Sequence, residues 1–132
     1  MTARAAGTFT LTSWDESTYQ ELDGDAKLTK ARMVFTWAGD AEGESTSDTF
    51  MCYRNDGTAV YTGLERIVGA LAGRSGSFVL LAEGAYEGGK ATTRWHVIEG
   101  SGTGELTGLR GEGSSVAAEA TGGTFSLDYD LG

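Results

Sequence analysis

Side chains along most of this chain alternate between apolar and polar at every second residue, and this pattern constrains the fold more than any other feature. Residues 31–37 place Met33, Phe35 and Trp37 on one parity, and residues 125–131 repeat the pattern. Successive side chains of a β-strand point to opposite faces, so a period of two is typical of strands with one buried face. The chain is therefore predicted to be all-β.

Turn signals such as Asn55-Asp56-Gly57 and Gly88-Gly89 separate the alternating segments. Six glycines lie within residues 100–113 and the chain has no proline, which suits a sheet that must bend sharply to close. We expect a short helical turn at 15–22 and eight strands near 7–14, 26–38, 42–54, 58–68, 76–87, 90–98, 103–110 and 123–131. The prediction is one domain over residues 1–132, a single eight-stranded antiparallel β-barrel, whose interior holds side chains or one small ligand.

Composition excludes several classes of partner. Nineteen acidic residues against ten basic ones give a net charge of −9, which disfavours nucleic acid and anionic membranes as partners. The single cysteine, Cys52, cannot form an internal disulfide, so we expect a cytoplasmic protein. The sequence contains no run of about eighteen apolar residues, so no membrane span is predicted. The first residues lack the apolar core of a signal peptide.

Conventional cofactor and metal motifs are weak. Residues 102–108 imitate a dinucleotide fingerprint, but the third glycine lies one place too far and no helix is expected to follow. His96, the sole histidine, is expected to face solvent, the alternative being a base or metal ligand. Four acidic residues share one parity: Asp40, Glu42, Glu44 and Asp48. They are expected to form a solvated outer face of a strand, the alternative being a weak calcium site. We predict no cofactor and no metal.

The best candidate for chemistry is the run from Tyr61 to Glu65. Tyr61, Gly63 and Glu65 share one strand face, and if that face is the lumen, Gly63 leaves room for a ligand beside a buried carboxylate and a phenol. Glu65 would then act as an acid or base of raised pKa, with Tyr61 as its catalytic companion. The alternative is a structural ion pair between Glu65 and Arg110.

The register of the strands around Asp56-Gly57 has two solutions. A two-residue turn places Tyr61 across from Cys52, whereas a three-residue loop places it across from Met51. We favour the longer loop, because it gathers Met51, Tyr53, Tyr61 and Glu65 inside. Phe50, Cys52, Val60 and Leu64 then form an apolar patch outside, which predicts a homodimer.

Aromatic side chains from several strands favour a ligand cavity for a small hydrophobic molecule. The alternative is that the same rings fill the barrel. The predicted ligand-binding residues are Trp37, Met51, Tyr53, Phe78, Leu80, Trp95, Arg110 and Tyr129.

Motifs spread over almost the whole chain resemble a bacterial family of unknown function that is abundant in actinomycetes and is assigned to the allene oxide cyclase-like barrels. They include residues 53–57, 61–65, 73–78 and the glycine-rich run 100–111. The resemblance implies an eight-stranded barrel with a lumen open at one end, related to cyclases that fold a reactive molecule without a cofactor. Where the family pattern has a Gln-His pair, this chain has Leu81-Ala82, which implies a more apolar lumen.

Three functions remain from different classes. The favoured one is a cofactor-free isomerase or cyclase acting on a hydrophobic oxygenated metabolite, polyketide-like or oxylipin-like, by confining it in the lumen. The second is a carrier of a small hydrophobic ligand. The third is a packed barrel with an interaction role, which a cavity approaching about 300 Å³ would argue against.

Overall fold

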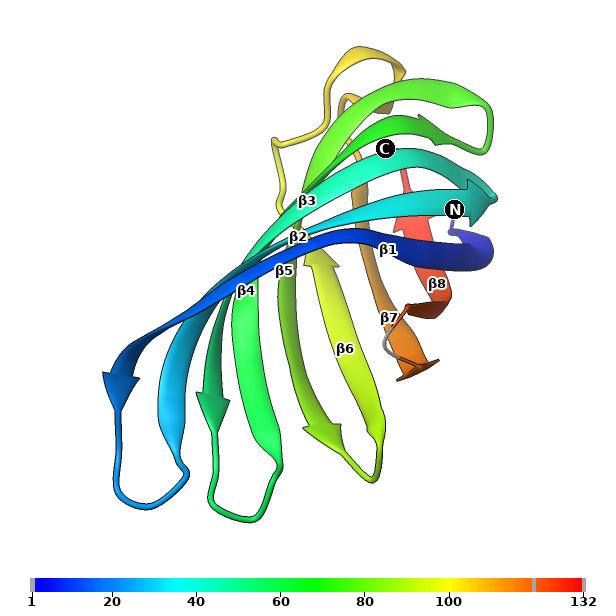
Figure 1. Cartoon of the computed structure of the whole chain (residues 1–132). Coiled ribbons are helices and arrows are strands. Elements are labelled where there is room, and N and C mark those ends of the chain that lie inside the picture. Colours follow the sequence, from blue (N-terminus) through cyan, green and yellow to red (C-terminus); the bar gives the residue numbers. More distant parts are fainter. Residues whose placement is uncertain (1, 120, 132) are drawn as a thin grey trace.

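The structure is a computed structural model that describes residues 2–119 and 121–131. Eight antiparallel strands form a closed barrel in the order of the sequence, with β8 returning to β1 (Figure 1). The strands are β1 (Ala3–Glu21), β2 (Lys27–Gly39), β3 (Ala41–Tyr53), β4 (Ala59–Leu71), β5 (Arg74–Glu87), β6 (Lys90–Val97), β7 (Arg110–Glu119) and β8 (Gly122–Asp130), and one 3-10 helix, η1 (Gly104–Leu106), precedes β7. The predicted fold class is confirmed.

The first strand is longer than predicted, and the expected helical turn at 15–22 is wrong. This segment continues β1, because residues 13–21 pair with residues 27–34 of β2. A β-bulge between Leu11 and Ser13 interrupts the ladder, and the Thr12 hydroxyl donates to the carbonyl of Val34 at 3.1 Å. Because one extra residue reverses the parity, Leu11 faces inward before the bulge and Trp14 faces inward after it.

The seventh strand begins where it was predicted to end. Residues 103–110 lead through η1 into β7 instead of forming a strand. The loop that follows β6 lies along the first half of β5, where the amide of Thr103 donates to the carbonyl of Ser77 at 2.9 Å. It turns tightly at Gly102, where a Cβ would collide with the carbonyl oxygen of Leu106.

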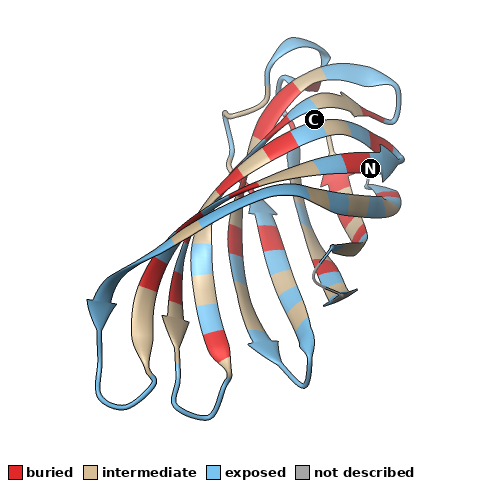
Figure 2. Ribbon diagram, viewed as in Figure 1, coloured by how far each residue is buried: buried red, intermediate tan, exposed pale blue. Residues whose placement is uncertain are grey.

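This loop plugs one end of the barrel. Leu106 and Leu109 are each 1% exposed, and they pack into the main apolar core with Leu71 and Phe78. The glycine-rich run therefore closes the end of the barrel. The expectation that it bends a strand of the sheet is wrong. At the other end the β1–β2, β3–β4 and β5–β6 hairpins project with exposed tips (Figure 2).

The favoured register is confirmed, since Met51 lies opposite Tyr61. It leaves Phe50, Val60 and Leu64 on the outside, where all three are exposed, with Cys52 half-buried. Within the described residues no helix is long and apolar enough to cross a membrane.

Candidate functional site

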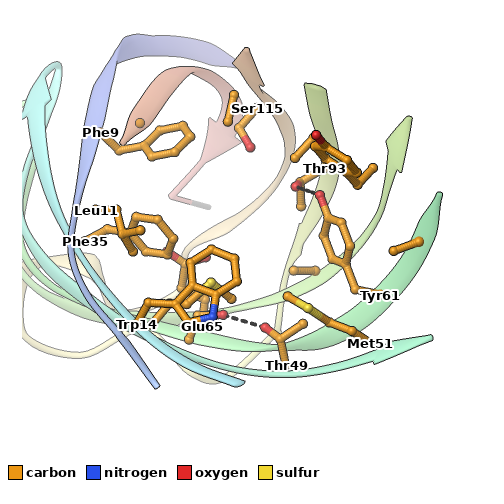
Figure 3. Close-up of a pocket in the computed structure, with 18 of the residues that line it drawn as sticks. Phe9, Leu11, Trp14, Phe35, Thr49, Met51, Tyr61, Glu65, Thr93 and Ser115 are labelled. Atoms are coloured by element: carbon orange, nitrogen blue, oxygen red, sulfur yellow. Dashed lines mark hydrogen bonds between the residues drawn. The ribbon is translucent and has the colours of Figure 1, made fainter. Parts of the chain in front are cut away.

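A cavity of about 420 Å³ occupies the lumen on the hairpin side of the plug (Figure 3). Trp37 and Trp95 line it with their ring centroids 5.2 Å apart, and Phe125 of the main core packs against Trp37 at 4.5 Å between centroids. Phe9 and Phe35 meet edge to face at 5.5 Å on the β1–β2 side. The cavity therefore has a wall of aromatic rings, which suits an apolar ligand.

Glu65 is the carboxylate of this cavity. Its residue is only 5% exposed, and its Oε2 accepts a hydrogen bond of 2.6 Å from the Ser45 hydroxyl. The indole N–H of Trp37 donates to Ser45 Oγ at 2.9 Å and so orients that hydroxyl. Burial raises the pKa of Glu65 to about 7, and the hydrogen bond from Ser45 offsets only part of the effect.

Tyr61 lies on the same cavity, on the opposite side from the β1–β2 rings (Figure 3). Its hydroxyl shares a hydrogen bond of 2.7 Å with the Thr93 hydroxyl, and burial raises its pKa. The ring packs over Gly84, where a Cβ would lie 2.6 Å from the tyrosine oxygen. Among the described residues no hydrogen bond joins Tyr61 to Glu65. The two side chains are therefore separate polar groups in the cavity wall.

Gly63 does not open the cavity as expected. A Cβ at this position would collide with the carbonyl oxygen of Asp48 on β3. The missing side chain therefore allows β3 and β4 to approach closely, and the idea that it makes room for a ligand is wrong.

A second carboxylate, Glu16, organises the rim and was missed from the sequence. Its Oε2 accepts hydrogen bonds from Thr29 Oγ1 at 2.6 Å and from the Tyr53 hydroxyl at 2.7 Å, and its Oε1 accepts one from Trp14 Nε1 at 3.0 Å. Burial opposes ionisation of Glu16, but these three bonds and the positive charge of Lys27 together outweigh it and hold the pKa below its ordinary value. Burial and the neighbouring Glu16 raise the pKa of Tyr53.

The other predicted site residues divide between the cavity and the packed end. Trp37, Met51, Tyr53 and Trp95 line the cavity. Phe78, Leu80 and Tyr129 also point inward, but they are buried in the main core at the plugged end.

Arg110 was predicted to face the lumen and to be a partner of Glu65, and both expectations are wrong. Its side chain is 70% exposed, and its Nε lies 3.5 Å from Glu99 Oε1. The reason is the displaced seventh strand: Arg110 opens β7, and Ser115 and Ala117 of that strand line the cavity instead.

Two further details concern polar groups. The indole N–H of Trp95 is buried and has no acceptor within the described part of the chain. His96 faces outward as expected and lies 3.7 Å from Glu112. The described residues contain no cluster of histidine, cysteine or carboxylate side chains that could hold a metal ion.

The fold and the site define a class of protein: a closed antiparallel barrel, plugged at one end, with an aromatic lumen and a buried carboxylate. Within that class the chain belongs to the family described as "Protein of unknown function (DUF3224)", whose model matches residues 5–129.

The chain is also similar to a solved structure of the same family, a protein of unknown function from Shewanella oneidensis MR-1. The TM-score is 0.84 and the identity 26%, over 100% of this chain and 99% of the other. No curated protein matches the chain.

Proposed function

We propose that this protein binds a small hydrophobic, oxygenated molecule in its lumen. The observation that carries the proposal is the cavity of about 420 Å³, which lies within the range of about 300–1,000 Å³ typical of ligand sites. A barrel packed shut by its own rings would leave no such space. The lining includes Gly89 of the β5–β6 turn and the exposed Trp14, so the cavity extends to the hairpin end, where a ligand would enter.

Binding can be tested with N-phenyl-1-naphthylamine, a neutral dye that fluoresces in apolar surroundings. Ala82 lines the cavity and is 5% exposed, so Ala82→Phe places a ring in the lumen. Ala85 lies on the opposite parity of β5, and Ala85→Phe adds the same ring outside. We expect the dye to bind the wild type and the Ala85→Phe variant and to bind Ala82→Phe at least about tenfold more weakly. Equal binding by both variants would contradict a lumen site.

A second function, catalysis, is favoured by Glu65. A carboxyl group with a pKa of about 7 is present in both protonation states near neutral pH, which suits a group that gives a proton to one atom of a substrate and takes one from another. We propose a cofactor-free isomerase or cyclase of the allene oxide cyclase-like kind. Glu65 would protonate a carbonyl or epoxide oxygen while the aromatic wall holds the substrate in a reactive shape.

Tyr61 would assist from the other side of the lumen as a neutral hydrogen-bond donor, because its raised pKa keeps the phenol protonated. The test is turnover of epoxides and dienones to products of unchanged mass, followed by chromatography with mass spectrometry. We expect Glu65→Gln to abolish turnover with dye affinity retained. Turnover that survives Glu65→Gln would remove Glu65 from the mechanism.

A further inference from the structure

The charges that line the cavity are unbalanced. Among its lining residues Glu65 is the only carboxylate, and the lining includes no lysine, arginine or histidine. The other titratable groups there are the phenols of Tyr53, Tyr61 and Tyr86. At the rim Glu16 accepts a hydrogen bond from Tyr53, and Lys27 Nζ lies 5.0 Å from the centroid of the Tyr53 ring. The side chains nearest Glu65 along β3 are the hydroxyls of Ser45 and Ser47.

Glu65 also has unused capacity to accept hydrogen bonds. Oε2 is bonded to Ser45, whereas Oε1 accepts no hydrogen bond from the described residues, and Glu65 belongs to the lining of the cavity. A carboxylate oxygen facing an apolar cavity gains most from a donor that arrives with the ligand, because no water is retained there once the ligand fills the space.

We propose that the lumen selects ligands that carry a hydrogen-bond donor, a hydroxyl or a protonated amine, on an apolar ring system, and rejects ligands that carry a carboxylate. This inference rests on the proposed binding function and narrows it. A carboxylate in the lumen would lie near Glu65 with no lining cation to compensate either charge. An oxylipin with a free carboxylate is therefore a poor candidate, whereas a hydroxylated or amino-substituted polycycle is a good one.

The aromatic wall supports the same selection. Trp37 and Trp95 line the cavity with their ring planes tilted by 36° to each other, and Trp37 is connected to Glu65 through Ser45. The negative faces of aromatic rings attract cations and repel anions, so the rings and the carboxylate act in the same direction.

The experiment compares four probes with one ring system by calorimetry: 2-naphthylmethanol, 2-naphthylmethylamine, 2-naphthoate and 2-methylnaphthalene. We expect the wild type at pH 8.5 to bind the alcohol and the ammonium at least about tenfold more tightly than methylnaphthalene, and naphthoate at least about tenfold more weakly. Lowering the pH to 5.5 protonates Glu65, so the ammonium should bind more weakly and the naphthoate more tightly, while both probes keep their own charges.

The variant Glu65→Gln should remove most of the difference between the ammonium and the naphthoate, whereas Glu44→Gln, which removes a charge from the exposed face of β3, should leave it unchanged. Equal binding of all four probes by the wild type would overturn the selection but leave the lumen as a ligand site. Binding of none of them would overturn the proposed binding function together with this inference. The wild-type series needs no variant, so the conclusion does not depend on the folding of Glu65→Gln.

Discussion

Replacing Glu65 with Gln should make the protein more stable at alkaline pH. The folded protein raises the pKa of this carboxyl group from 4.5 to about 7. A tenfold change in proton affinity corresponds to about 1.4 kcal/mol. The folded state therefore loses about 3 kcal/mol of stability relative to the unfolded chain as the pH rises from about 4.5 to about 7.

The sign follows from which state binds the proton. Between these two values the folded protein holds the proton on Glu65 and the unfolded chain has lost it, so stability falls as the pH rises. Glutamine keeps the shape and does not titrate. Relative to the wild type, Glu65→Gln should thus gain about 3 kcal/mol between pH 4.5 and pH 8.

Urea denaturation at pH 5 and pH 8 measures this gain, with Glu44→Gln as the control for net charge. Other carboxylates also titrate, so the quantity that matters is the difference between wild type and variant at each pH. If that difference is the same at both pH values, Glu65 does not carry a raised pKa and the description of its environment is wrong. A loss of stability at pH 8 would instead indicate a buried ion pair, which the outward position of Arg110 argues against.

Three other predictions concern the plug, the tyrosine and the outer face. Leu106→Ala should lower the free energy of unfolding by about 3 kcal/mol, because it empties a site in the core of the plug; a loss below about 1 kcal/mol in urea denaturation would show that the loop packs loosely. Gly84→Ala would place a Cβ against both the carbonyl oxygen of Thr92 and the ring of Tyr61, so it should cost about 1–3 kcal/mol and weaken dye binding by displacing the ring; unchanged binding and stability would contradict these contacts. We also propose that the exposed patch around Leu64 mediates a homodimer that Leu64→Asp dissociates in sedimentation equilibrium; a wild type that stays monomeric at high micromolar concentration would exclude it.

Much of the barrel could be predicted because alternation is a local property. The inward position of Trp37 and Trp95 follows from the parity of their own strands, and the length of the turn after Tyr53 sets the register of β3 and β4. Extending that register places Ser47 opposite Glu65. The hydroxyl groups next to Glu65 could therefore be predicted from the sequence.

The misses arise where the alternation breaks. The bulge after Leu11 reverses the parity of β1. Trp14 and Glu16 therefore lie on the face opposite to the one that simple alternation predicts for them. Glycines at 100–108 gave no periodicity at all, and the start of β7 depends on how the plug loop packs against β5, which is a tertiary contact. Arg110 was wrongly predicted to face the lumen because β7 was predicted to end at this residue, whereas β7 begins there.

The order of the strands has a consequence for how the chain folds. Seven of the eight strand pairs join neighbours in the sequence, and only the pairing of β1 with β8, from Ala3 opposite Tyr129 to Thr10 opposite Gly122, joins the two ends of the chain. Short connections close rapidly, whereas this last pairing must first gather more than a hundred residues. We expect the β1–β8 seam to form last during folding, and its backbone amides to be among the first in the ladder to exchange with deuterium when the native barrel opens.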